Sequence, residues 1–218
     1  MIELRKVSKA YGSTHVLRDL NLTVREGEFV SIRGKSGVGK TTLLKIVGLL
    51  ETPDKGEVKL FGRAVNGLSD DEKSELRLHH IGFVFQFFNL IPSLTVLENI
   101  ELPLALAKIG RCERRRRALE LLDYFGLTGL AERFPETLSG GERQRIAVIR
   151  ALANSPKIIL ADEPTSSLDD ENSQLLMELL NKINRERKVT IILTTTDLYE
   201  RLPANRDFVL RDGSLIER

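Results

Sequence analysis

A glycine-rich run near the start of the chain combines residues that suit phosphate binding. Residues 34–41 read Gly-Lys-Ser-Gly-Val-Gly-Lys-Thr and fit the pattern G-x-x-x-x-G-K-[ST]. Glycines allow the backbone to wrap closely around phosphate oxygens, and a helix that starts after the loop adds the positive end of its dipole. We therefore predict that a phosphate chain is held by Gly34, Lys35, Ser36, Gly37, Val38, Gly39, Lys40, Thr41 and Thr42.

An acidic pair later in the chain completes this predicted site. The apolar run 158–161 predicts a strand, and two acids follow at its carboxyl end. Ligands of open α/β sheets bind outside that edge. Lys40 is expected to reach the β- and γ-phosphates of a nucleotide. Thr41 and Asp162 are expected to hold Mg²⁺, and Glu163 is expected to polarise an attacking water.

A phosphate loop alone is compatible with a kinase, a GTPase, a helicase or a transporter motor. Residues 138–142 separate these classes, because they read Leu-Ser-Gly-Gly-Glu and resemble the signature of the ABC (ATP-binding cassette) family, LSGGQ in its commonest form. Ser139 is a good helix N-cap, and the two glycines permit a close approach of the backbone to an anion. The resemblance covers essentially the whole chain.

The resemblance implies a head-to-tail dimer, formed with a second copy or with a different ATPase chain, that holds two ATP molecules at its interface. The γ-phosphate of the ATP on the second subunit is then bound by Ser139, Gly140, Gly141 and Glu142. Tyr11 matches the aromatic residue that stacks on adenine. Gln86 matches the Q-loop glutamine, which touches Mg²⁺ or water and couples to the membrane partner. Asp169 matches the D-loop, which crosses the dimer interface.

The sequence departs from the family pattern after the strand near 189–194. Family members usually have a histidine there, whereas residues 194–197 read Thr-Thr-Thr-Asp and Thr196 occupies the place of the histidine. Threonine donates a hydrogen bond but carries no positive charge. Because Glu163 is present, we expect slower hydrolysis rather than a loss of ATP binding.

These residues require an ordered set of strands and helices. Strand patterns occupy residues 2–7, 16–24, 29–32, 57–61, 81–85, 157–161, 189–194 and 208–210, the last being the expected final strand. Helical patterns occupy residues 41–50, 70–78 and 170–187. Residues 95–153 are helical, without a convincing strand, and are punctuated by proline and by a glycine pair.

Alternating strands and helices predict an α/β fold with parallel strands at the centre of a sheet. With the resemblance, this becomes a P-loop NTPase (RecA-like) core with a small antiparallel β subdomain and an inserted α-helical subdomain. The chain is expected to form a single ABC ATPase domain over 1–218. Residues 1–87 and 156–218 form the nucleotide-binding core with the β subdomain, and 88–155 form the helical signature subdomain.

The composition is that of an ordinary globular protein. Of 218 residues, 41% are hydrophobic and 29% are charged, and a net charge of +2 is too small to imply nucleic-acid or membrane-surface binding. Cys112 is the single cysteine, so no disulfide within the chain is expected. We find no signal peptide and no apolar run of about 18 residues. The chain is therefore expected at the cytoplasmic face of the cell membrane, bound to a separate integral membrane permease.

Residues 87–106 resemble the lipoprotein-release and macrolide-export group of the family, whose members act on a separate membrane protein. Two alternatives remain open. A soluble ABC ATPase that acts on nucleic acid or ribosomes is suggested by the basic run 114–117, but acids such as Glu120 follow it and favour a solvated helix face. No nucleic-acid partner is therefore expected. A weakly hydrolysing regulatory cassette is suggested only by Thr196.

Overall fold

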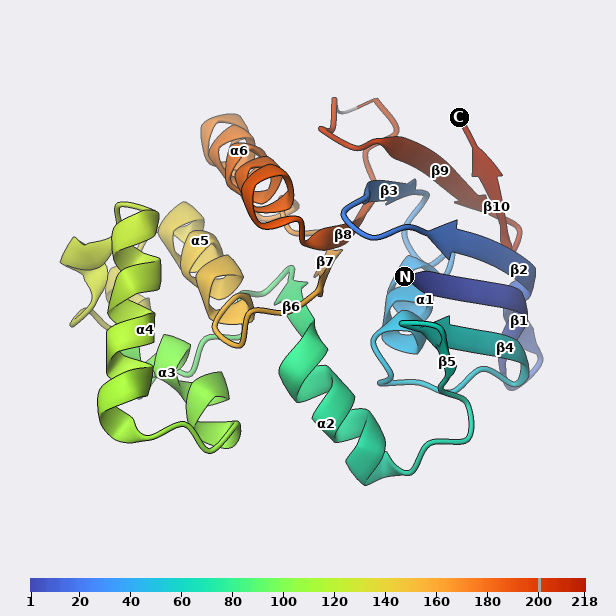
Figure 1. Cartoon of the computed structure of the whole chain (residues 1–218). Coiled ribbons are helices and arrows are strands. Elements are labelled where there is room, and N and C mark those ends of the chain that lie inside the picture. Colours follow the sequence, from blue (N-terminus) through green and yellow to red (C-terminus); the bar gives the residue numbers. More distant parts are fainter. Residues whose placement is uncertain (200) are drawn as a thin grey trace.

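Two β-sheets and their covering helices are stacked in layers (Figure 1). The computed structural model describes residues 1–199 and 201–218. The six-stranded sheet has the order β10 (Ser214–Glu217), β9 (Arg206–Arg211), β3 (Phe29–Arg33), β8 (Thr190–Thr195), β7 (Ile158–Asp162), β6 (Ile81–Phe85). The four-stranded sheet has the order β2 (Thr14–Val24), β1 (Ile2–Tyr11), β4 (Lys55–Leu60), β5 (Arg63–Ala64).

The central strands of the six-stranded sheet are parallel, as predicted. β3 pairs with β8 and β9, and β7 pairs with β6 and β8. Every residue of β3 and β8 is buried, and both strands carry apolar side chains on both faces, as expected for strands covered on both sides. Parallel strands place their carboxyl ends along one edge, so the segments that follow β3, β6, β7 and β8 meet there.

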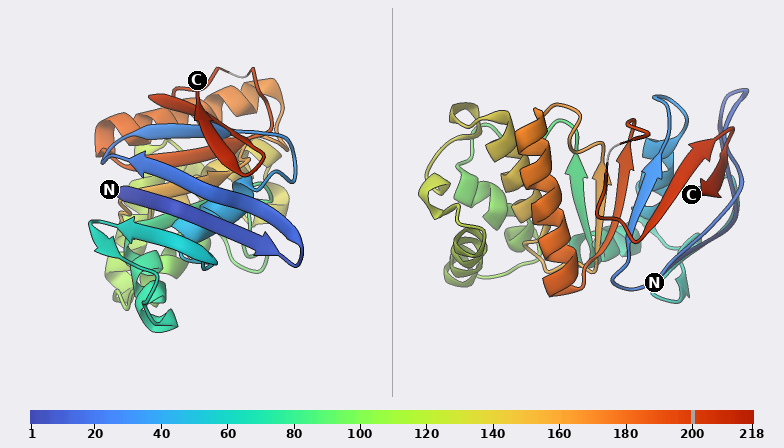
Figure 2. Two further views of the ribbon diagram at one scale, coloured as in Figure 1. Left: turned by 90° about the vertical axis from the view of Figure 1, so that its right-hand side faces the viewer. Right: turned by 90° about the horizontal axis from the view of Figure 1, so that it is seen from above.

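The four-stranded sheet is antiparallel and packs over α1 (Lys40–Val47). Figure 2 shows this helix between the two sheets. Leu43 and Ile46 of α1 are buried in one cluster with Leu4 of β1 and Ile32 of β3. Burial against both sheets fixes the helix, and with it the glycine-rich loop that precedes it.

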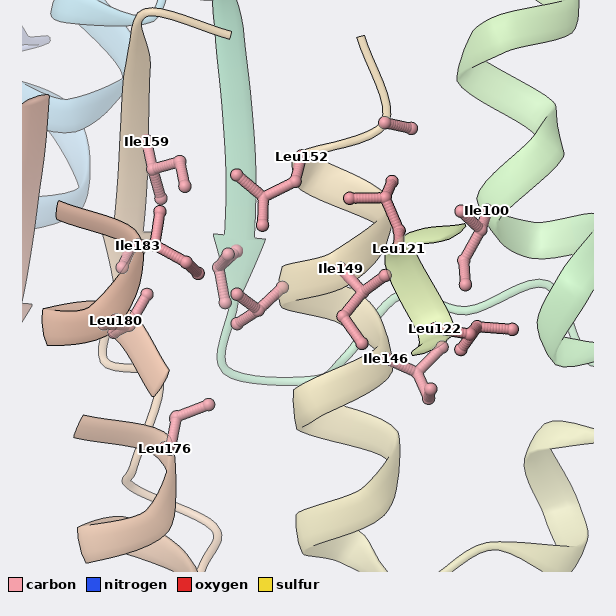
Figure 3. Close-up of a cluster of buried hydrophobic side chains, with 14 of the residues drawn as sticks. Ile100, Leu121, Leu122, Ile146, Ile149, Leu152, Ile159, Leu176, Leu180 and Ile183 are labelled. Carbon is pink, nitrogen blue, oxygen red and sulfur yellow. The ribbon is translucent and has the colours of Figure 1, made fainter. Parts of the chain in front are cut away.

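The remaining helices are α2 (Asp70–His80), α3 (Val96–Leu106), α4 (Arg111–Tyr124), α5 (Gly140–Ala151) and α6 (Asp170–Arg187), with short 3₁₀ turns at Thr128–Leu130 and Pro135–Thr137. α5 and α6 cover the other face of the six-stranded sheet, and α3 and α4 lie outside α5 (Figure 1). Figure 3 shows the core between them, with Ile149 of α5 near Leu121 of α4, and Ile183 of α6 near Ile159 of β7. No helix in the described residues is both long enough and apolar enough to cross a membrane.

The expectation that 208–210 is the final strand was wrong. β9 continues to Arg211, and β10 follows it in an antiparallel hairpin. Asp212 and Gly213 both have positive φ, at 51° and 82°, and Asp-Gly is a favoured pair for this kind of tight turn. The helix expected over 41–50 ends at Val47. Gly48 is its C-cap, Leu49 has a left-handed φ of 58°, and the Leu50 amide donates back to the Lys45 carbonyl oxygen at 2.8 Å.

Candidate nucleotide and catalytic site

The predicted phosphate loop and acidic pair meet at the carboxyl edge of the six-stranded sheet. β3 leads into the loop, β6 ends one residue before Gln86, and β7 ends at Asp162. Together they bound a hollow of about 390 Å³. It is lined by Tyr11, Val16, Ser36, Gly37, Gly39, Lys40, Thr41, Thr42, Gln86, Asp162 and Glu163. The hollow therefore joins residues that are more than a hundred positions apart in the sequence.

The glycine at the end of the loop is required by its backbone and by its surroundings. Gly39 has φ 113°, a conformation that side chains with a Cβ rarely adopt. A Cβ on Gly39 would lie 2.5 Å from Cγ1 of Val16. Gly39 also starts α1 without a capping side chain. The first-turn amides of α1 are thus suited to bind an anion in the hollow that residues 39–42 line.

Lys40 is a buried cation that points along the loop. Its ammonium donates to the backbone oxygens of Gly34 at 2.7 Å and Lys35 at 3.0 Å. Its Nζ lies 3.1 Å from Oε1 of Glu163. A buried ammonium held among oxygen acceptors in a glycine-rich loop fits a polyphosphate ligand. Three predicted phosphate-binding residues do not line the hollow of the phosphate loop: Gly34, Lys35 and Val38 line a separate hollow on the side of β9.

Asp162 receives a hydroxyl donor at each of its two carboxylate oxygens. Thr41 donates to Oδ2 at 2.7 Å, and Thr194 of β8 donates to Oδ1 at 2.7 Å. A carboxylate beside a hydroxyl is a hard oxygen donor set of the kind that Mg²⁺ prefers. Thr41 and Asp162, two of the three predicted metal ligands, therefore fit the ion.

Glu163 occupies an unusual backbone conformation directly after β7. Its φ of 47° is in the left-handed region, and its N–H is directed to Thr194, 3.1 Å from the carbonyl oxygen and 3.2 Å from the hydroxyl. Such strain clusters at functional sites. Glu163 also lines a second hollow of about 250 Å³, and Thr196 lines this one rather than the hollow of the phosphate loop.

Gln86 and Tyr11 lie at the border of the first hollow. The backbone oxygen of Gln86 accepts a hydrogen bond from the Ser167 hydroxyl at 3.3 Å, so the predicted Q-loop contacts the predicted D-loop. Tyr11 is 48% exposed, and its hydroxyl lies 3.3 Å from a carboxylate oxygen of Glu51. An exposed ring at the rim of the hollow is accessible to a flat ligand.

The signature residues form the start of α5 and do not line the hollow of the phosphate loop. Ser139 and Glu142 make a reciprocal capping box, in which the Glu142 amide donates to the Ser139 hydroxyl at 3.2 Å and the Ser139 amide donates to Glu142 Oε2 at 2.8 Å. The hydrogen bond from the Ser139 backbone lowers the pKa of Glu142. The side chain therefore stays ionised near neutral pH and holds the helix start rigid.

Asp169 caps α6 and contacts the signature helix through a shared neighbour. Its carboxylate accepts the Asn172 amide at 2.8 Å, and this bond lowers the pKa of Asp169. The Asn172 side chain also packs against Gly141, where a Cβ would lie 1.8 Å from Asn172 Oδ1. Gly140 has ordinary contacts with Leu168 instead. The second glycine of the signature is thus required by the approach of α6.

Two contacts of the site were not predicted from the sequence. One is the Thr194 hydroxyl beneath the acidic pair. The other is Gln144 of α5, which is fully buried and donates to the backbone oxygens of Phe85 at 3.0 Å and Pro164 at 2.8 Å. Gln144 thereby connects the signature helix with the strand end before Gln86 and with the turn after Glu163. Both roles depend on neighbours that are distant in the chain.

Comparisons with known proteins agree with this geometry. Residues 17–166 match the family described as ABC transporter. The ATP-binding cassette MJ0796 of Methanocaldococcus jannaschii, in a dimeric post-hydrolysis state bound to ADP and Pi, superposes with a TM-score of 0.90 at 45% identity, covering 100% of this chain and 98% of that one. The lipoprotein-releasing system ATP-binding protein LolD of Bacteroides fragilis is 43% identical over 99% of this chain and 100% of its own length.

The macrolide export ATP-binding/permease protein MacB of Escherichia coli is also 43% identical over 99% of this chain, which spans 34% of that longer protein. These relatives match the lipoprotein-release and macrolide-export group. The fold, the family match and the relatives together establish that the chain belongs to the ABC transporter family, as one of its ATP-binding and ATP-hydrolysing cassettes.

Proposed function

We propose that this chain is the motor subunit of an ABC transporter of the exporter or lipoprotein-release type, and that it drives a separate membrane permease. The main support is the hollow that gathers Lys40, Asp162 and Glu163 at one sheet edge. We also propose a division of labour within the chain. Residues 1–87 and 156–218 hold the nucleotide, and residues 88–155 present the signature.

The site residues divide the work on ATP between them. The loop amides and Lys40 bind the phosphates, and Tyr11 stacks on the adenine. Thr41, Asp162 and Gln86 would hold Mg²⁺, which when bound would neutralise charge on the phosphates. Glu163 accepts a proton from the attacking water. The ion pair between Lys40 and Glu163, at 3.1 Å, supports assigning both residues to the same site.

A second subunit is needed to complete the site. Ser139 to Glu142 belong to the predicted γ-phosphate contacts, yet none of them lines the hollow within this chain. The dimeric cassette MJ0796, bound to ADP and Pi, supports a complete site built from two chains. We propose that two cassettes close head to tail, so that α5 of each presents Ser139 to the ATP of the other.

A glutamine at position 163 tests this arrangement. Glu163→Gln removes the base but keeps the shape of the side chain, so ATP is retained and the dimer accumulates. We expect size-exclusion chromatography with ATP and Mg²⁺ to show a dimer for Glu163→Gln. Adding Ser139→Arg, or Lys40→Ala, should return the protein to a monomer.

A Glu163→Gln variant that binds ATP but stays monomeric at every concentration would contradict the composite site. Dimerisation that persists in the Ser139→Arg double variant would do the same, because the signature would then lie outside the interface. Circular dichroism of each variant controls for loss of the fold.

The permease contact is proposed at the groove between α2, α3, α5 and β6. This groove has a volume of about 250 Å³ and a mainly apolar lining that includes Phe85, Leu102 and Leu106. Leu106 is 62% exposed, and Phe87, next to Gln86, is 73% exposed. Phe85 of the groove directly precedes Gln86, the residue that the resemblance links to the membrane partner. This supports a cytoplasmic segment of the permease as the occupant of the groove. Binding there would attach the chain to the cytoplasmic face of the membrane.

A further inference from the structure

One buried hydroxyl contacts both acidic residues of the site. Thr194 Oγ1 donates to Oδ1 of Asp162 at 2.7 Å and lies 3.2 Å from the backbone nitrogen of Glu163, whose N–H it accepts. Thr194 is 0% exposed, so bulk water does not compete for the hydrogen bonds of its hydroxyl. Its single hydroxyl donates to the Asp162 carboxylate and accepts the backbone N–H of Glu163.

Strand pairing holds Thr194 in this place. Asp162 and Thr194 are direct partners in the parallel ladder of β7 and β8. The N–H of Glu163 also lies 3.1 Å from the carbonyl oxygen of Thr194. The left-handed backbone at Glu163 is therefore anchored to Thr194 by both its carbonyl and its hydroxyl.

We propose that Thr194 is a positioning residue for the Mg²⁺-nucleotide complex. The terminal torsion of an aspartate is soft, so a carboxylate without a fixed partner samples many orientations. The Thr194 hydroxyl fixes Oδ1, and this directs Oδ2 to Thr41, 2.7 Å away, on the side of the hollow. The proposal rests on the proposed function, because it concerns the ion that accompanies ATP.

The alternative role for Thr194 is that of an ordinary buried residue in a strand. The same strand supplies a control for that role. Thr190 is also 0% exposed, and its hydroxyl accepts the Gly27 amide at 2.9 Å, away from both acids. Replacing either threonine by valine removes a buried hydroxyl and nearly preserves the shape. Only Thr194→Val should alter the response to the metal.

The test measures binding of a fluorescent, non-hydrolysable ATP analogue, first in EDTA and then over a titration with Mg²⁺. Affinity in EDTA should be the same for wild type, Thr194→Val and Thr190→Val. The Mg²⁺ concentration at half-effect should rise about tenfold in Thr194→Val only, the lower end of the loss expected for a hydrogen bond to a charged group. Mn²⁺ binding followed by electron paramagnetic resonance should show the same shift.

A second pair of variants tests the role of the hydroxyl without relying on valine to pack like threonine. Thr194→Ser and Thr194→Ala leave a similar space but differ in the hydroxyl, so only the alanine variant should need more Mg²⁺. An unchanged Mg²⁺ dependence in Thr194→Val and Thr194→Ala would overturn the proposal, as would an equal shift in Thr190→Val. A wild-type chain that binds no nucleotide, with or without metal, would instead overturn the proposed function.

Discussion

At the scale of single residues, Glu163 is the point where two hollows meet. On one side it lies beside the Lys40 ammonium, and on the other it borders the hollow that Thr196 lines. Among the described residues that line this second hollow, none is basic, whereas Asp170 and Asp197 are acidic. Glu163 thus has a cationic neighbour on one side only. Thr196 offers a neutral donor at the position where the family resemblance leads us to expect a histidine.

This asymmetry predicts slow hydrolysis with near-normal ATP binding, and a faster Thr196→His variant. A lost charge-assisted hydrogen bond is worth roughly 1.5–3 kcal/mol, so a histidine that makes it would raise the rate about ten- to a hundredfold if it acts fully in the transition state. Single-turnover hydrolysis at saturating ATP compares the two chains. Equal rates, with equal ATP affinity, would show that Thr196 does not limit turnover.

The sequence was most informative about residues whose roles follow from the pattern of their immediate neighbours in the chain. The loop 34–41 and the strand that ends at Asp162 can be placed from local patterns, because glycine spacing and an apolar run with terminal acids are local signals. Thr194 has no such signal. In the sequence it is one of three consecutive threonines, and only the pairing of β7 with β8 assigns its hydroxyl to Asp162.

At the scale of elements, α5 connects the signature with the segment after Gln86. Its first turn carries the Ser139 and Glu142 capping box, and its last turn carries Arg150. The Arg150 guanidinium donates to the backbone oxygens of Asn89 and of Phe88, the latter at 3.1 Å. Both of these residues have positive φ, so an arginine on α5 holds a strained loop. Burial lowers the pKa of Arg150, yet arginine remains charged at neutral pH.

Arg150→Met should therefore loosen residues 86–91 while keeping most of the buried length of the side chain. Loss of two carbonyl contacts from a charged donor should lower the free energy of unfolding by about 2 kcal/mol. Hydrogen exchange of amides 86–91 should become faster. Arg116→Met is the control, since Arg116 pairs with Glu113 and Glu120 on the exposed face of α4. Unchanged exchange in 86–91 would refute the anchoring role of Arg150.

The limits of the sequence are also visible at this scale. Three helices start at capping boxes, led by Ser69, Thr95 and Ser139, and such starts can be located from the spacing of serine or threonine and glutamate. β10 was missed because it is four residues long and only one of them, Leu215, is both apolar and half-buried. Its pairing with β9, rather than its own pattern, makes it a strand.

At the scale of the whole molecule, the nucleotide hollow and the apolar groove are connected by β6. Phe83 and Phe85 of this strand line the groove, and the next residue, Gln86, lines the hollow. The rings of Phe83 and Phe85 are stacked with centroids 5.7 Å apart, and Gln144 donates to the backbone oxygen of Phe85. A partner that moves the groove would therefore also move Gln86 and α5. The resemblance implied that Gln86 couples to the membrane partner, but the groove itself could not be located from the sequence, because it is formed by helices that are separated along the chain.

We predict that Leu106→Glu will uncouple the chain from its permease without impairing its own ATP site. Leu106 lines the groove and lies in α3, away from the residues of the nucleotide hollow. A charge there places an unpaired carboxylate against an apolar partner surface, and loss of an anchor of this kind costs about 2 kcal/mol or more, or roughly thirtyfold in affinity. Leu175→Glu is the control, because Leu175 is also an exposed leucine but lies on α6.

The permease is first identified by mass spectrometry of the integral membrane protein that co-purifies with the wild-type chain, and is then reconstituted in nanodiscs with each variant. We expect Leu106→Glu to hydrolyse ATP at the basal rate, to bind the permease about thirtyfold more weakly and to lose stimulation by it, while Leu175→Glu behaves as wild type. Full stimulation of Leu106→Glu, or an equal loss in Leu175→Glu, would place the permease elsewhere on the molecule.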